Sequence, residues 1–84
     1  MLEENEVLEV LNKIFKEKLC DKSIELNLDT TADDILEWNS LKHLVIVLAI
    51  ENHFKIKFNP IQLSNMRNIG EMIDIITSLI QSKN

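Results

Sequence analysis

Apolar residues recur at intervals of three and four along three segments of this 84-residue chain, and this period restricts the chain to a helical fold. The segments are residues 2–19, 40–54 and 69–80. A short fourth helix is predicted over residues 60–66, because Asn59 can cap it and Pro60 suits its first position. We therefore predict an all-α four-helix bundle, with three principal helices and one short helix, in a single domain spanning residues 1–84.

Residues 20–39, between the first two principal helices, lack this period and indicate a long ordered loop. Thr31 and Asp34 can cap one short turn within it. Trp38 is expected to anchor the end of the loop against the bundle. The intermittent apolar residues are expected to anchor the rest; they are Ile24, Leu26, Leu28, Ile35 and Leu36.

The charge of −5 is unevenly distributed along the chain. Residues 1–40 contain eleven acids and four bases, a net −7, whereas residues 41–84 contain three acids and five bases, a net +2. An acidic chain repels the phosphates of nucleic acids and anionic membrane surfaces, so we expect protein partners with basic patches and no nucleic acid.

The cysteine and histidine content excludes two kinds of stabilising site. Cys20 is the only cysteine, so no disulfide can form within the chain, and two histidines do not complete a zinc ligand set.

The acidic N-terminal residues are unlike a secretory signal, and the longest apolar run, residues 44–50, is too short to insert across a membrane. These features predict a cytoplasmic protein.

The segment 40–54 is apolar on two sides. Ile46, Ile50 and Phe54 fall on one face of the predicted helix. The nearly opposite face carries an apolar stripe, Leu41, Val45 and Leu48. A stripe left open in so small a protein is typical of a docking site. The alternative is a central helix buried on both sides.

Ser40 stands at the start of this helix and has two possible roles. It can be an ordinary N-cap, but Asn39 can cap equally well. A serine at a helix N-terminus can instead carry a phosphate group, which the free N–H groups and the helix dipole stabilise. No hydrolase triad, glycine-rich phosphate loop or metal ligand set accompanies it, so we predict no catalytic residues and no metal.

The helix order and the motif Trp38-Asn39-Ser40-Leu41-x-His43-Leu44 resemble the acyl carrier proteins over about the whole chain. This resemblance implies that a phosphopantetheinyl transferase attaches 4′-phosphopantetheine from coenzyme A to Ser40, flanked by Asn39 and Leu41. It also implies a non-catalytic, monomeric carrier that holds acyl groups as thioesters. Its partners would be the acyl-loading and acyl-transfer enzymes of fatty acid, polyketide or related biosynthesis. The residues expected to dock these partners are Leu41, Val45, Leu48, Asp33, Asp34 and Glu37.

The chain departs from the usual family pattern at two points. Asn39 replaces the aspartate that usually precedes the serine, and Glu51 is the only acid on a helix that is typically acidic. Two alternatives stay open beside the acyl carrier. One is a peptidyl or aminoacyl carrier, and the other is an unmodified helical adaptor in which Ser40 is merely a cap.

Overall fold

The structure is a computed structural model that describes residues 3–82. Its α-helices are α1 (Glu4–Lys18), α2 (Ser40–Phe54), α3 (Pro60–Ser64) and α4 (Ile69–Ser82). A single 3₁₀ turn, η1 (Ala32–Asp34), lies in the loop between α1 and α2, and no strand occurs among the described residues. The predicted all-α fold of three principal helices and one short helix is confirmed.

Two predicted helix boundaries differ from the observed ones. The first helix was expected from Leu2, which lies outside the described residues, and α1 begins at Glu4. The short helix was expected to reach Met66, but α3 ends at Ser64 and Met66 is buried in the core. The N-terminus of α3 is as predicted, because Asn59 Oδ1 accepts a hydrogen bond from Gln62 N at 2.7 Å.

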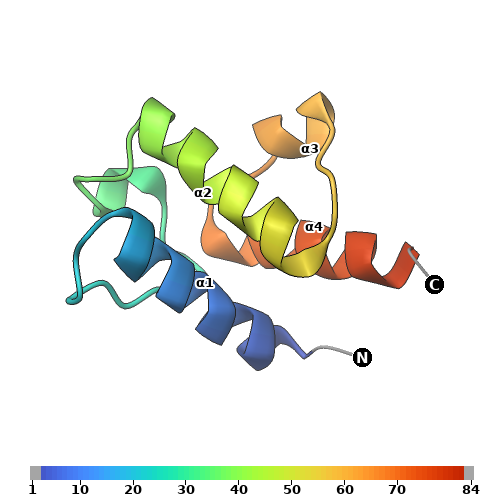
Figure 1. Ribbon diagram of the computed structural model, residues 1–84, viewed down its shortest axis with the longest axis horizontal. Helices are drawn as coiled ribbons and strands as arrows, with labels where there is room; N and C mark the ends of the chain where they lie inside the picture. Colours follow the sequence, from blue (N-terminus) through green and yellow to red (C-terminus); the bar gives the residue numbers. More distant parts are fainter. Residues whose placement is uncertain (1–2, 83–84) are drawn as a thin grey trace.

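α1 packs against both α2 and α4, and α1 and α2 run antiparallel (Figure 1). This arrangement brings the start of α2 to the end of α1. Each principal helix contributes its buried apolar side to the core. The buried core residues of these helices are Val7, Leu11, Phe15, Ile46, Ile50, Ile69, Met72, Ile73 and Ile76.

Backbone groups of the loop between α1 and α2 make hydrogen bonds to α1 and to the start of α4. Leu26 N donates to Asn12 Oδ1 at 2.8 Å. Ile69 N donates to Thr30 O at 3.0 Å, and Gly70 N donates to Leu28 O at 2.9 Å. A Cβ atom at Gly70 would lie 3.1 Å from Leu28 O, so the only glycine of the chain permits the close approach of loop and helix.

The expected apolar anchors of this loop are confirmed in part. Ile24, Leu26 and Trp38 are buried, and Ile35 packs against the core. The prediction is wrong for Leu28 and Leu36, which are exposed, Leu36 to 95%. Irregular backbone has no repeating period, so sequence spacing does not show which of its side chains face inward.

Candidate functional site

Asn39, and not Ser40, caps the N-terminus of α2. Its backbone is extended, and its Oδ1 atom accepts a hydrogen bond from Lys42 N at 2.9 Å. Its carbonyl oxygen accepts the next bond, from His43 N at 2.8 Å. The N–H groups of Ser40 and Leu41 in the first turn have no intrahelical acceptor. The cap thus leaves both the Ser40 hydroxyl and these two donors available to a ligand.

Ser40 is exposed, and its hydroxyl has no hydrogen-bond partner among the described residues. The other serine hydroxyls either donate a hydrogen bond or lie away from a helix start. Ser64 donates to Ile61 O at 2.8 Å and Ser82 to Leu79 O at 3.0 Å. Ser78 is exposed but lies inside α4, away from a helix start. Ser40 therefore combines a free hydroxyl with the positive end of a helix dipole.

Trp38 fixes the chain directly before this serine. Its indole is buried and meets the Phe15 ring edge-on at 4.8 Å. Its Nε1 atom donates to His43 Nδ1 at 3.0 Å, which joins the end of the loop to the first turn of α2. The predicted anchoring role of Trp38 is confirmed. The same bond ties helix α2 to the preceding loop.

His43 is half-buried and accepts this bond through Nδ1, so the other ring nitrogen carries the proton. Burial lowers the pKa of His43 below its ordinary value, because the charged imidazolium is poorly solvated there. The histidine beside Ser40 is therefore an uncharged structural group.

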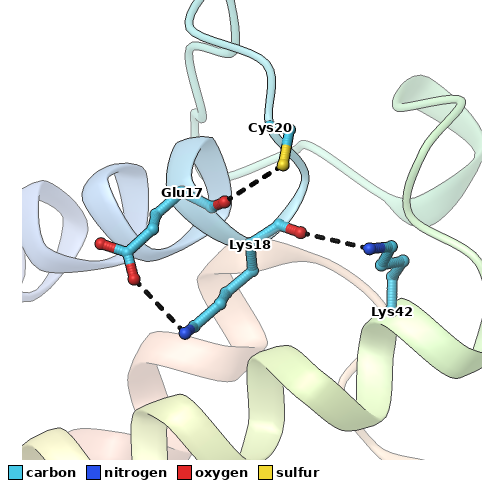
Figure 2. A network of polar contacts seen from close by, with 4 residues as sticks. All are labelled: Glu17, Lys18, Cys20 and Lys42. Atoms are coloured by element: carbon cyan, nitrogen blue, oxygen red, sulfur yellow. Dashed lines mark hydrogen bonds and ion pairs between the residues drawn. The ribbon is translucent and has the colours of Figure 1, made fainter.

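The Lys42 side chain reaches toward α1. Figure 2 shows its Nζ atom beside the Lys18 carbonyl, a contact of 3.5 Å that connects the first turn of α2 to the last turn of α1. A lysine ammonium is favourable there, because the C-terminal end of a helix carries partial negative charge. Lys42 thus serves helix packing.

An open hollow of about 500 Å³ lies beside Ser40. Its lining includes Trp38 and His43 from the anchored end of the loop and the first turn of α2, and Met66 and Arg67 from the α3–α4 connection. The free hydroxyl, the free N–H groups and this hollow fit a phosphate-linked group attached to Ser40.

The three acids predicted to contact partners fall into two places. Asp33 lines the hollow beside Ser40. Asp34 and Glu37 instead line a second open groove, of about 580 Å³, together with other carboxylates of the loop. The Asp34 carboxylate also has a structural role, because it accepts a hydrogen bond from Thr31 N at 2.9 Å and completes the capping box of η1.

The second groove contains an organised carboxylate. Asp21 accepts hydrogen bonds from the Ser23 hydroxyl and from Ser23 N. The Ser23 bonds hold the pKa of Asp21 below its ordinary value. The Asp21 carboxylate therefore stays charged to a lower pH than an ordinary aspartate.

The predicted apolar stripe of α2 lies on the surface. Leu41, Val45 and Leu48 are 70%, 36% and 57% exposed, whereas Ile46 and Ile50 on the other face are fully buried. The alternative of a helix buried on both sides is thus wrong. Leu44, 55% exposed, belongs to the same stripe and was missed, although its spacing of three from Leu41 would have indicated it.

Among residues 3–82 no three histidine, cysteine or acidic side chains are grouped to hold a metal ion. None of the helices in this range has the length and apolar character required to cross a bilayer.

The sequence profile of the family described as "Phosphopantetheine attachment site" matches residues 9–76. The "Acyl carrier protein homolog" of Mycoplasma genitalium is 33% identical over 79 residues, which cover 89% of this chain and 93% of that protein. The chain belongs to the acyl carrier protein family.

A solved acyl carrier protein has the same fold. The solution NMR structure of holo acyl carrier protein from Geobacter metallireducens superimposes with a TM-score of 0.85 at 36% identity, over 90% of this chain and 87% of that one. The chain is therefore an acyl carrier protein with a 4′-phosphopantetheine prosthetic group, non-catalytic by itself, that works with acyl-handling enzymes. Family membership favours the carrier over the unmodified adaptor.

Proposed function

We propose that Ser40 carries the 4′-phosphopantetheine group of this acyl carrier protein. The observation that supports this most strongly is the division of roles at the start of α2, where Asn39 caps the helix and the exposed Ser40 hydroxyl has no partner among the described residues. When bound, the group supplies a terminal thiol that holds acyl groups as thioesters.

The residues around Ser40 fit the phosphate end of such a group. The N–H groups of Ser40 and Leu41 are donors without an intrahelical acceptor, and the helix dipole favours a negative charge at the same place. Asn39 does not occupy these donors, because its Oδ1 atom accepts from Lys42 N instead. Asn39 and Leu41 are thus the positioning neighbours of the attachment residue.

Partner enzymes would meet two different surfaces. Leu41, Val45 and Leu48 form an exposed apolar stripe that starts next to Ser40. A phosphopantetheinyl transferase and acyl-loading or acyl-transfer enzymes would bury this stripe. Asp33, Asp34 and Glu37 would attract a basic patch on the partner from the loop side. Because Glu51 is the only acid on α2, we expect partners to contact this helix through its apolar residues and not through acidic ones.

We propose an acyl group, held as a thioester, as the cargo. We place the protein in fatty acid, polyketide or related biosynthesis, as a monomer of one domain. A chain whose only cysteine, Cys20, is exposed and unpaired suits the reducing cytoplasm, where we place its activity.

Intact-mass measurement tests the attachment site. The wild-type protein is incubated with coenzyme A and a broad-specificity phosphopantetheinyl transferase, and its mass should rise by one 4′-phosphopantetheine. Ser40→Ala should gain nothing, whereas Ser78→Ala, which removes another exposed serine hydroxyl, should be modified like the wild type. No gain in the wild type, or an equal gain in Ser40→Ala, would contradict the proposal.

A further inference from the structure

Arg67 lines the same hollow as Ser40, although the two residues are far apart in the sequence. We propose that the Arg67 guanidinium binds the phosphodiester that joins 4′-phosphopantetheine to Ser40. The inference rests on the proposed attachment at Ser40 and adds to it a phosphate-binding residue on a different element.

The position of Arg67 suits this role. It follows α3, in the connection to α4, and its backbone N–H donates to Asn65 O at 3.0 Å. Its Nε atom lies 3.5 Å from Glu71 Oε1, so Glu71 orients the guanidinium from one edge. The two terminal nitrogens have no partner among the described residues, and a phosphate can accept two parallel N–H bonds from an arginine fork.

Among the charged groups considered near the hollow, only Arg67 is suited to bind the phosphodiester. Asp33 also lines the hollow and would repel a phosphodiester, which carries one negative charge. Lys42 is turned toward the Lys18 carbonyl of α1. His43 is uncharged near neutral pH, because burial lowers its pKa. Arg67 is thus the only positive side chain among the residues that line the hollow.

Binding at Arg67 would hold the root of the prosthetic arm toward the α3–α4 connection. The contact would be weak and easily released, because the Arg67 side chain is 79% exposed and Glu71 offsets part of its charge. A carrier needs such a contact, since partner enzymes must be able to draw the arm away. Added salt should weaken the contact, as it screens charges that face solvent.

The guanidinium itself provides the first test, because Arg67 is the only arginine in the chain and its side-chain NMR signals need no assignment. Protein labelled with ¹⁵N is compared before and after modification, which intact mass verifies. We expect the Arg67 Nε and Nη signals to shift on modification and to return toward the unmodified positions in 1 M NaCl. Identical signals in the unmodified and modified protein would overturn the inference while leaving attachment at Ser40 intact.

The phosphorus signal provides the second test. The ³¹P resonance of the modified protein should move in Arg67→Gln, move less in Arg67→Lys, and stay in place in Lys57→Gln, which removes an exposed positive charge elsewhere. An equal ³¹P position in wild type and Arg67→Gln would overturn the inference. If no variant and no wild-type protein gains mass, the attachment proposal fails and the inference fails with it.

Discussion

The two faces of α2 contain the same kinds of residue and have opposite environments. Ile46, Val47 and Ile50 are buried, whereas Leu41, Leu44 and Leu48 are exposed. The difference arises from the neighbouring elements, because α1 packs against one side of α2 and the other side remains on the surface. Apolar character alone therefore does not identify the core of a small bundle, and the uncovered face is available for partners.

Truncating one buried and one exposed side chain of α2 should give the largest difference in the free energy of unfolding. Ile50→Ala should lower the free energy of unfolding by about 2–5 kcal/mol, because it removes a buried side chain and leaves a cavity. Leu48→Ala should change it by less than about 0.5 kcal/mol, as is usual for surface positions. Urea denaturation measures both values. Similar losses for the two variants would show that the outer face is covered in solution.

The loop before α2 also contains one buried and one exposed apolar side chain, Trp38 and Leu36, which can be compared in the same way. Trp38→Phe should cost about 1–3 kcal/mol, because it leaves the half-buried His43 Nδ1 without its donor. Leu36→Ala should cost almost nothing, since Leu36 is exposed. Thermal denaturation of both variants checks this, and a loss for Leu36→Ala equal to that for Trp38→Phe would be contrary to the structure.

A charge placed on the outer face should affect partners and not folding. Val45→Glu should lower kcat/KM for modification by a phosphopantetheinyl transferase about tenfold, which corresponds to about 1.4 kcal/mol of lost contact. Its urea midpoint should stay near that of the wild type. Ser78→Glu, which adds the same charge to exposed α4 surface, serves as the control. Unchanged kinetics in Val45→Glu would remove the apolar stripe from the docking surface.

The smallest expected effect is the pH dependence contributed by His43. Its pKa is lowered in the folded protein, so the unfolded chain binds more protons between that value and about 6.5. Stability from this group is fully present above about pH 6.5 and falls as the pH drops toward the folded pKa.

Unfolding measured across this pH range should detect the His43 contribution. His43→Gln should flatten the pH dependence, whereas His53→Gln, on the exposed end of the same helix, should retain it. A slope that persists in His43→Gln would assign the dependence to other groups.

Much of the fold follows from local sequence patterns. The bounds of α2 and the caps Thr31, Asn39 and Asn59 could be predicted, because the helical period and capping chemistry act over a few residues. Exposure in the loop could not be predicted, as Leu36 shows, because irregular backbone has no period.

The site was only partly accessible to the same reasoning. Ser40 and its cap are adjacent in the chain, so their roles could be predicted together. Arg67 was missed because its place beside Ser40 depends on how the loop and the α3–α4 connection meet in three dimensions. The hydrogen bond from Gly70 to Leu28 shows the same limit, since no local pattern relates these two segments.

We propose that the modified hydroxyl is that of Ser40, at the start of α2. Tandem mass spectrometry of proteolytic fragments of the modified protein tests it directly, because the chain contains five serines, Ser23, Ser40, Ser64, Ser78 and Ser82. We expect all of the added 4′-phosphopantetheine to lie on Ser40. Modification found on any other serine, with Ser40 unmodified, would contradict it.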